Sequence, residues 1–213
     1  MHLLAHRGFW KKPEEKNSRL AFEMSAREGY GIETDIRDAG GELVIAHNMP
    51  VKGEVLMSFS EFLELYLGKS SSPGYLAINI KADGLQDAVR DELQRFKVKK
   101  YFVFDMSVPD TLGYQKLGLN FFSRVSEYET SPILFEECAG IWLDAFHSEW
   151  YQCKQIGEWV SKGKQICIVS PEVHKRPHQK LWEELKTTGL HLLESVLLCT
   201  DFPDQARNFF HEQ

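Results

Sequence analysis

Residues 76–104 read LAINIKADGLQDAVRDELQRFKVKKYFVF, which is an apolar run, an amphipathic stretch and a second apolar run. The two apolar runs, Leu76–Ile80 and Tyr101–Phe104, are short and rich in aliphatic and aromatic residues, which predicts β-strands. Because strands separated by a helix pair in parallel, the stretch predicts a strand–helix–strand unit of an α/β fold. The apolar residues of the predicted helix recur every three or four positions, at Leu85, Val89, Leu93 and Phe96.

The same alternation of apolar runs and amphipathic stretches continues along the whole chain. Eight such units in 213 residues fit a compact (β/α)8 TIM barrel, with residues 1–213 as a single domain. An open doubly wound sheet would alternate in a similar way, but no G-x-G-x-x-G nucleotide loop follows the first predicted strand. The predicted strands are Leu3–Ala5, Ile32–Ile36 with Leu43–Ala46, Leu76–Ile80, Tyr101–Phe104, Asn120–Ser123, Ile141–Leu143, Gln165–Val169 and Val196–Cys199.

Two of the predicted helices have recognisable ends. Ser58 and Glu61 have the S-x-x-E spacing of a capping box, which predicts a helix beginning at this point. Gly189 follows an amphipathic stretch around Leu181 and Leu185, and a glycine in that position is typical of a helix end.

The composition narrows the classes of protein to consider. The formal net charge is −6, and no run of Lys or Arg is longer than a pair, which argues against nucleic-acid binding. No segment approaches the roughly 20 apolar residues that span a bilayer, so we expect no stable membrane insertion and a cytoplasmic location. The four cysteines lack C-x-x-C spacing and are interpreted as reduced residues in or near the core.

Polar residues follow the first predicted strand. His6 and Arg7 come directly after Leu3–Ala5, and taken alone the sequence His-Arg-Gly is also typical of a surface turn. In a TIM barrel, however, the active site gathers at the carboxyl ends of the strands. The residues that end the other strands therefore decide between the two interpretations.

The second predicted strand has two acidic residues on one face. Glu33 and Asp35 are two positions apart, and the period of two in a strand directs them to the same side. Two inward carboxylates repel each other unless a cation lies between them, and oxygen ligands favour Mg²⁺ or Ca²⁺. The alternative is an exposed strand face with two solvated acids.

Further polar residues end the next apolar runs. His47 follows Leu43–Ala46, and Asn79 and Lys81 share one face at the end of Leu76–Ile80. Each of these residues alone has an ordinary structural explanation. Two histidines, two acids, an arginine and a lysine at successive strand ends together predict a site for an anionic substrate bound through a metal, with acid and base catalysts beside it.

These motifs resemble the glycerophosphodiester phosphodiesterase family, whose pattern runs H-R-G, P-E-N, E-x-D, a D-G turn with H-D, and E-x-K. The resemblance spans nearly the whole chain in the right order. The matching residues are His6-Arg7-Gly8, Pro13-Glu14 with Asn17-Ser18, Glu33-Thr34-Asp35, Gly41-Glu42 with His47, Asn79-Ile80-Lys81 and, for a closing T-D-x-P segment, Thr200-Asp201-Phe202-Pro203.

The resemblance implies a metal-dependent (β/α)8 barrel that hydrolyses glycerophosphodiesters to glycerol phosphate and an alcohol. It implies a divalent metal, Mg²⁺ or Ca²⁺, and a small-molecule phosphodiester as substrate. It also implies a role for each matching residue. His6 and His47 would be the base and the acid, Glu33, Asp35 and Asn79 the metal ligands, and Arg7, Lys81 and Asn17 the contacts to substrate and phosphate.

The chain departs from the family pattern at three places. The third acidic ligand is Asn79 here, which keeps an oxygen ligand but removes a negative charge. The aspartate that follows the second histidine is Asn48, and Glu15 and Lys16 are extra residues ahead of Asn17. An altered site of this kind is also compatible with a changed substrate or with lost catalysis.

Two other functions stay open on the sequence alone. One is a non-catalytic barrel that binds a phosphodiester or a sugar phosphate with a weakened metal site, although a binding module needs no acid and base. The other is a lyase or phospholipase that acts on a lipid headgroup, which predicts an apolar rim. Outside the family motifs, Asp105 is a candidate for the site mouth, and Asp144 and His147, which follow a predicted strand end, are candidates for contact with substrate. His174 is interpreted as part of a solvated turn.

Overall fold

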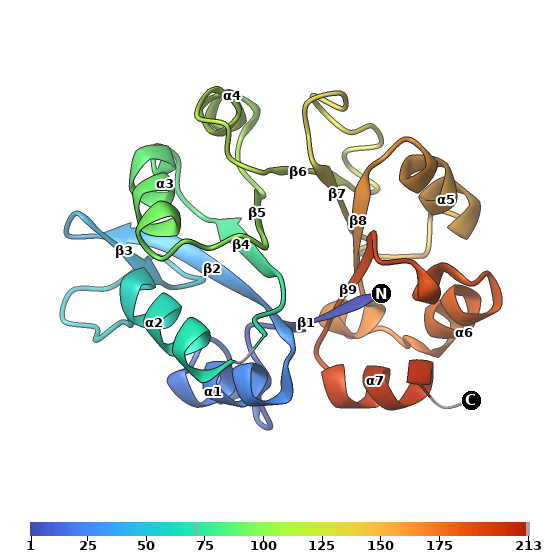
Figure 1. The fold of residues 1–213 in the computed structure, drawn as a ribbon, viewed down its shortest axis with the longest axis horizontal. Coiled ribbons are helices and arrows are strands. Elements are labelled where there is room, and N and C mark those ends of the chain that lie inside the picture. The colour runs from blue at the N-terminus through green and yellow to red at the C-terminus, as the bar shows by residue number, and fades with distance from the viewer. Residues whose placement is uncertain (71, 212–213) are drawn as a thin grey trace.

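A computed structural model describes residues 1–70 and 72–211 of the chain. Eight parallel strands form a barrel, in the order β5-β4-β2-β1-β9-β8-β7-β6 (Figure 1). The predicted TIM-barrel fold is therefore confirmed. The barrel strands are β1 (His2–His6), β2 (Gly31–Ala39), β4 (Leu76–Ile80), β5 (Tyr101–Phe104), β6 (Phe122–Val125), β7 (Gly140–Leu143), β8 (Gln165–Val169) and β9 (Val196–Thr200).

The barrel closes unevenly around its circumference. β1 and β9 pair over four residues, which brings the first strand of the chain beside the last. Between β5 and β6 the described residues form a single isolated bridge, Val103 to Phe121, and the Val103 N–H donates to the carbonyl of Asn120 at 2.9 Å. This junction, which we call the β5–β6 seam, has fewer paired residues than any other pair of neighbouring barrel strands.

The second apolar run of the predicted β2 region forms a hairpin and not a barrel strand. β3 (Glu42–Ile45) pairs antiparallel to the far end of β2. The hairpin extends β2 beyond the barrel and places His47 just after its returning strand.

Helices cover the outside of the barrel, with α1 to α3 on one side and α5 to α7 on the other (Figure 1). No helix forms within residues 126–139, so β6 and β7 are joined by a loop, which departs from a complete (β/α)8 pattern. The α-helices of the described residues are α1 (Arg19–Glu28), α2 (Phe59–Lys69), α3 (Gln86–Arg95), α4 (Val108–Lys116), α5 (Cys153–Ser161), α6 (Gln179–Thr187) and α7 (Pro203–His211). Short 3-10 helices form at Pro13–Glu15, Pro171–His174 and Leu190–Leu192.

The predicted helix ends are confirmed by their hydrogen bonds. The Glu61 N–H donates to Ser58 Oγ at 3.1 Å, and the Ser58 N–H donates back to Glu61 Oε2 at 2.8 Å, which completes the capping box of α2. Gly189 follows the end of α6 with a φ of 74°, in the left-handed region that glycine adopts without strain.

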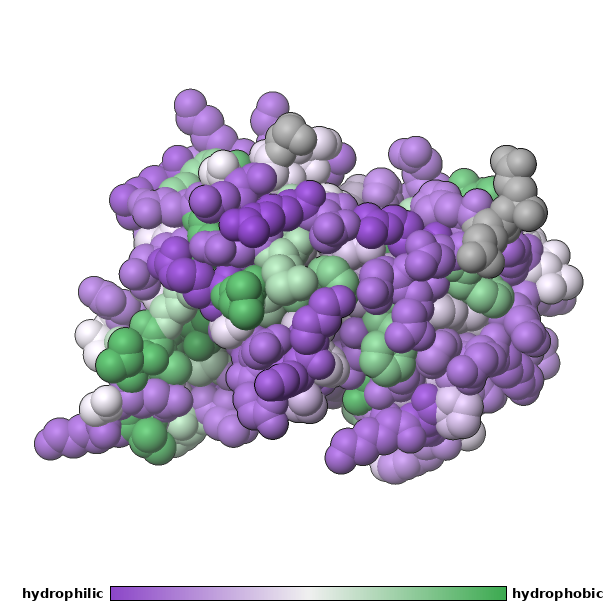
Figure 2. All heavy atoms as spheres, turned by 90° about the horizontal axis from the view of Figure 1, so that it is seen from below, coloured by the Kyte–Doolittle hydropathy of each residue, from purple (hydrophilic) through white to green (hydrophobic). Residues whose placement is uncertain are grey.

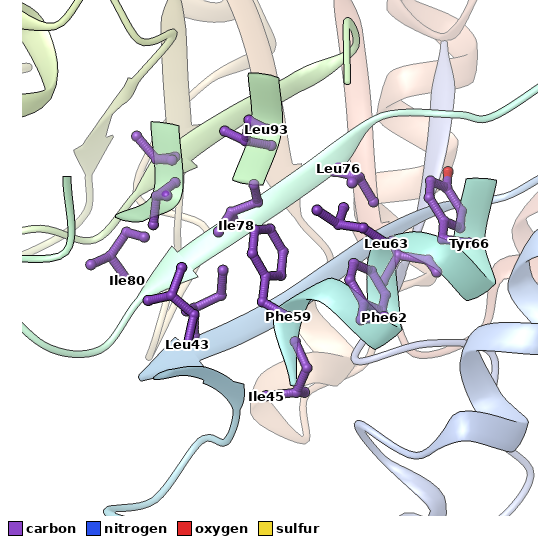
Figure 3. Packing of buried hydrophobic residues seen from close by; sticks show 14 of the residues in the cluster. Leu43, Ile45, Phe59, Phe62, Leu63, Tyr66, Leu76, Ile78, Ile80 and Leu93 are labelled. Atoms are coloured by element: carbon purple, nitrogen blue, oxygen red, sulfur yellow. The ribbon is translucent and has the colours of Figure 1, made fainter. Parts of the chain in front are cut away.

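Two layers of buried side chains hold the fold together. Outside the strands, α2 and α3 pack Phe59, Phe62, Leu63 and Leu93 against Ile78 of β4 and its neighbours (Figure 3). Inside the barrel, every second residue of the strands points to the axis, as a period of two requires. This inner layer contains Leu4, Ala77, Phe102, Phe104, Phe122, Trp142, Cys167, Val169, Leu197 and Cys199.

The inner layer determines what lies at the top of the barrel. Two positions beyond Leu4, Ala77 and Phe122 come His6, Asn79 and Arg124, which continue the same inward faces. The apolar layer is therefore the floor of a polar site at the carboxyl ends of the strands.

The face on the side of α1 and α7 is largely hydrophilic (Figure 2). Seen from the side of α1 and α7, the molecule shows hydrophobic side chains only in small separate patches (Figure 2). Among residues 1–70 and 72–211, no helix is long and apolar enough to cross a membrane. All four cysteines are free, and Cys138, Cys167 and Cys199 are buried, as predicted.

Candidate active site

A cavity of about 290 Å³ opens at the carboxyl ends of the barrel strands. Its floor is apolar, with Phe104, Trp142 and Cys199 among the lining residues. Most of the predicted site residues meet there, together with several that the sequence did not indicate. The polar lining residues are His6, Arg7, Lys16, Glu33, His47, Asn79, Lys81, Asp105, Arg124, Asp144 and His174.

His6 ends β1 and is paired with a carboxylate from the other end of the chain. Its Nδ1 lies 2.6 Å from Asp201 Oδ1, and Asp201 follows β9, the strand beside β1. Hydrogen bonding to His6 and the charge of Lys16 outweigh burial and lower the pKa of Asp201, so Asp201 is a carboxylate that only accepts. Nδ1 of His6 therefore carries the proton, and Nε2 has the free lone pair.

The surroundings of His6 favour the neutral imidazole. Burial lowers the pKa of His6, although the hydrogen bond and the charge of Asp201 act in the opposite direction. Its Nε2 lies 3.8 Å from Glu33 Oε2, on the side of the cavity. A neutral ring with a free nitrogen is the form that a general base requires.

Asp201 is itself fixed by two other residues. Glu172, from the 3-10 helix after β8, accepts the Asp201 N–H at 3.1 Å and also binds the hydroxyl of Thr200. Lys16 donates to both carboxylate oxygens of Asp201, at 3.3 and 3.2 Å, and its ammonium group lies over the ring of Trp10. One of the two extra residues ahead of Asn17 therefore brings a cation to the cavity.

The two acids of β2 have different surroundings. Glu33 lines the cavity and is almost fully buried, and burial together with the charge of Asp35 raises the pKa of Glu33 to about 8. Asp35 is fully buried beneath the cavity lining, where Arg7 Nε approaches one carboxylate oxygen at 3.0 Å and Lys81 Nζ the other at 3.6 Å. The inward orientation predicted for both carboxylates is confirmed, whereas solvated acids on an exposed face are excluded.

Asn17 lies behind Asp35 and not on the cavity. Its side-chain N–H donates to Asp35 Oδ2 at 3.0 Å, and its Oδ1 accepts from the Thr34 hydroxyl at 2.9 Å. Both ends of the amide are used within the protein, so the structure places Asn17 as a support for Asp35.

The backbone at Arg7, Asn17 and Asp105 is left-handed, with φ of 57°, 58° and 73°. This conformation is costly for residues with a side chain, and such positions cluster at functional sites. The Arg7 N–H donates to the carbonyl of Glu33, and the Asn17 N–H donates to the carbonyl of Arg7, both at 2.9 Å. The next residue, Gly8, has a φ of 86°, and a Cβ there would lie 2.8 Å from Ala21 Cβ, which explains the glycine of the His-Arg-Gly motif.

Asn79 lies opposite Asp35 in the pairing of β2 with β4 and reaches the cavity lining. Asn79 Oδ1 and Asp35 Oδ1 are both buried without a hydrogen-bond donor. Buried oxygens of this kind normally have a partner. Together with a buried Glu33, whose raised pKa a nearby cation would lower, these oxygens fit the ligands of a hard divalent cation.

The ion pairs of Asp35 weaken the attraction of this site for a metal ion. Arg7 and Lys81 already neutralise Asp35, so the electrostatic attraction for a further cation is reduced. Within the described residues, no three His, Cys, Asp or Glu side chains are grouped as metal ligands, which is consistent with an amide at position 79.

His47 lies at the edge of the cavity. The residue is exposed, and its Nδ1 is 3.0 Å from the amide oxygen of Asn48. Within residues 1–70 and 72–211 it has no carboxylate partner of the kind that Asp201 is for His6. Lys81 has a second ion pair with Asp105 at 3.3 Å, and Asp105 in turn binds Arg124. Asp105 and Asp144 both line the cavity, whereas His147, the other candidate for contact with substrate, is not among the lining residues.

Three polar lining residues were not predicted from the sequence: Lys16, Arg124 and His174. Arg124 lies within β6, which begins two residues later than predicted, so that the predicted strand ended before it. His174 is not part of a solvated turn, because its Nε2 lies 2.6 Å from Asp144 Oδ1 at the cavity wall.

Solved structures with a similar fold include phosphodiesterases. A glycerophosphodiester phosphodiesterase from Parabacteroides distasonis matches with a TM-score of 0.70 and 20% identity, over 99% of this chain and 96% of that chain. A phosphodiesterase from Oleispira antarctica, in complex with the product sn-glycerol-3-phosphate, matches with a TM-score of 0.72 and 15% identity, over 100% and 97% of the two chains.

A more distant match extends the likeness to a neighbouring class of enzymes. A Ca²⁺-dependent phosphatidylinositol-specific phospholipase C from Streptomyces antibioticus has a TM-score of 0.54 and 9% identity, over 98% of this chain and 95% of that chain. No family model and no curated protein matches the sequence. The similar structures thus agree with the resemblance seen in the motifs, and at these identities they establish the fold.

Proposed function

We propose that the chain is a phosphodiester hydrolase that acts on glycerophosphodiester-type substrates and releases an alcohol and glycerol phosphate. The observation that carries this proposal is the His6–Asp201 pair, because His6 lines the same cavity as Arg7 and Lys81. The fold shared with glycerophosphodiester phosphodiesterases supports it, as does the product bound to one of them.

In the proposed reaction, His6 Nε2 takes the proton of the attacking hydroxyl group. The oxygen of that group bonds to phosphorus, the bond from phosphorus to the alcohol oxygen breaks, and His47 gives a proton to the departing oxygen. Arg7 and Lys81 balance the charge on the phosphoryl oxygens. Attack by the substrate's own hydroxyl gives a cyclic phosphate, whereas attack by water does not, and phosphorus NMR of the early products distinguishes the two routes.

A divalent cation, Mg²⁺ or Ca²⁺, would be held by Glu33, Asp35 and Asn79. When bound, it would supply Lewis-acid stabilisation of charge on a phosphoryl oxygen. The buried oxygens without donors support this assignment, and the ion pairs of Asp35 with Arg7 and Lys81 indicate modest affinity.

One experiment tests the function directly. Purified protein is assayed on a panel of glycerophosphodiesters with Mg²⁺, Ca²⁺, Mn²⁺ or EDTA, and release of glycerol phosphate is measured. We expect turnover that depends on the added metal. Full activity after exhaustive chelation would remove the metal from the proposal, and binding of the diesters without turnover on any of them would favour the phosphodiester-binding barrel.

A further inference from the structure

The wall of the cavity away from His6 contains a second histidine–carboxylate pair that the proposed mechanism does not use. Asp144 is the first residue after β7, and His174 ends the 3-10 helix after β8. His174 Nε2 lies 2.6 Å from Asp144 Oδ1, and the side chains are 23% and 9% exposed. Both residues line the cavity, so the pair faces the space that the substrate would occupy.

The pair is held in place by its neighbours. Asp144 Oδ1 also accepts the Ala145 N–H at 2.8 Å, and the Asp144 carbonyl accepts from Trp150 Nε1 at 2.8 Å. The His174 ring packs against Phe146, with the ring centroids 4.8 Å apart. A surface turn would not fix both partners in this way, and a fixed polar pair at a cavity wall is typical of a ligand contact.

Most of the charged side chains at this wall form ion pairs with one another. Asp105 is paired with Lys81 and Arg124, and Arg124 is also paired with Glu129. Asp144 is engaged by His174. An ammonium group would have to compete with these existing pairs for a carboxylate, and an acyl chain would bury charged groups without compensating hydrogen bonds.

Hydroxyl groups suit the same wall. A hydroxyl both donates and accepts, so it can bind Asp144 or a ring nitrogen of His174 and also accept from Arg124. Phe146 and Trp142 also line the cavity and supply apolar contact area for the carbon skeleton. We propose that Asp144 and His174, together with Arg124 and Phe146, form a subsite for a polyhydroxylated alcohol attached to the phosphate.

This inference rests on the proposed function and names the class of alcohol that the reaction releases. Diesters of glycerol phosphate with a polyol, such as inositol or glycerol, are the expected substrates. Diesters with choline and lysophospholipids are expected to be poor substrates, because a site built to bind hydroxyl groups rejects analogues that lack them.

The test compares kcat/KM for glycerophosphoinositol, glycerophosphocholine and the p-nitrophenyl diester of glycerol phosphate. We expect a preference of roughly 10²-fold for inositol over choline in the wild type. Asp144→Asn and His174→Phe should reduce that preference to less than about tenfold, mainly by lowering kcat/KM for the inositol diester. His147→Gln is the matched control, because His147 binds Tyr128 and lies outside the cavity lining.

Each outcome decides the inference. An equal loss on all three diesters in Asp144→Asn, with unchanged circular dichroism and melting temperature, would place the pair in catalysis or folding and overturn it. If the wild type turns over none of the diesters, the proposed function fails, and binding of inositol 1-phosphate against phosphocholine, measured by titration calorimetry, tests the subsite alone. Tighter binding of inositol 1-phosphate that is lost in Asp144→Asn supports the subsite, and equal affinities overturn it.

Discussion

His6 illustrates how one residue acquires its chemistry from distant parts of the chain. Its pair with Asp201 joins residues 195 positions apart, and the pairing of β1 with β9 brings them together. The carboxylate fixes the ring and its tautomer, as the aspartate of a catalytic triad does.

The two histidines of the proposed mechanism should each be required. His6→Ala and His47→Ala should lower turnover of the preferred diester by roughly 10²- to 10⁴-fold, the usual contribution of general acid–base catalysis. Circular dichroism should show intact folding. A variant that keeps nearly wild-type turnover would remove that histidine from the mechanism.

Lys16 should contribute to binding of an anionic substrate. Its ammonium group lines the cavity 3.2 Å from Asp201, so Lys16→Met should raise KM by roughly tenfold, the value of one charge-assisted hydrogen bond. Lys12→Met removes an exposed lysine from the same segment and is the control. Equal KM values for the two variants would show that Lys16 does not contact the substrate.

Asn79 should determine metal affinity. Asn79→Glu adds a third carboxylate beside Glu33 and Asp35, and the affinity of oxygen-ligand sites rises with ligand charge. We expect Mg²⁺ or Ca²⁺ to bind roughly tenfold more tightly, about 1.4 kcal/mol, in titration calorimetry. The metal-free variant should also melt at a lower temperature, because it buries one more like charge. Unchanged or weaker affinity would mean that position 79 does not face the metal.

At the scale of secondary-structure elements, the loop between β6 and β7 supports the loop that follows β7. Glu127 accepts the backbone N–H groups of Phe146, His147 and Ser148, at 3.0, 2.9 and 3.2 Å. Burial alone would raise the pKa of Glu127, but these hydrogen bonds outweigh it and lower the pKa to about 2. The carboxylate thereby positions Phe146 at the cavity.

The lowered pKa of Glu127 has a definite pH dependence. A group with a lower pKa in the folded state stabilises the fold above its unfolded pKa, near 4.3, and loses that contribution as the pH falls toward 2. Glu127→Gln should therefore lower the melting temperature at pH 7 and flatten its decline between about pH 4.3 and 2. Parallel melting curves for variant and wild type across that range would contradict the assignment.

The elements that the sequence predicted correctly are those with a strong local pattern. The apolar runs of β4, β5 and β8 and the capping box of α2 are visible within a few residues. The loop between β6 and β7 was not predicted, because apolar residues such as Phe135 pack there without forming a helix. Local patterns fix the strands, whereas the form of a connection depends on what it packs against.

The same distinction applies to the site. Glu33, Asn79 and Lys81 could be predicted because each lies in or directly after a strand whose inward face follows from a period of two. Lys16 and His174 lie in loops and 3-10 turns, so their positions depend on the closed barrel. No sequence spacing links Lys16 to Asp201 or His174 to Asp144.

On the scale of the whole molecule, neighbouring barrel strands are paired over three or more residues except at the β5–β6 seam. Two buried clusters lie on either side, one packed around β2 and β4 and the other around β7 to β9. Openings that separate β5 from β6 should therefore require less free energy than global unfolding.

Hydrogen exchange measures that difference. The buried amide of Val103, which bonds across the seam to Asn120, should exchange at least tenfold faster than the buried amide of Ile166, which bonds to Ser195 at 2.8 Å between β8 and β9. NMR of the uniformly labelled protein gives both rates in one experiment. Equal protection would show that the barrel closes as firmly at the seam as elsewhere.

The ion pair between Asp105 and Arg124 spans this seam at the mouth of the cavity, since Asp105 follows β5 and Arg124 belongs to β6. This ion pair connects the two strands where backbone hydrogen bonds are few. A ligand that draws Arg124 toward itself competes with Asp105, and thermodynamic linkage then requires that occupancy of the pocket and the opening of the seam influence each other reciprocally. Because the hydrogen-bond ladder is interrupted there, a ligand that binds Arg124 should change how readily the β5–β6 seam opens.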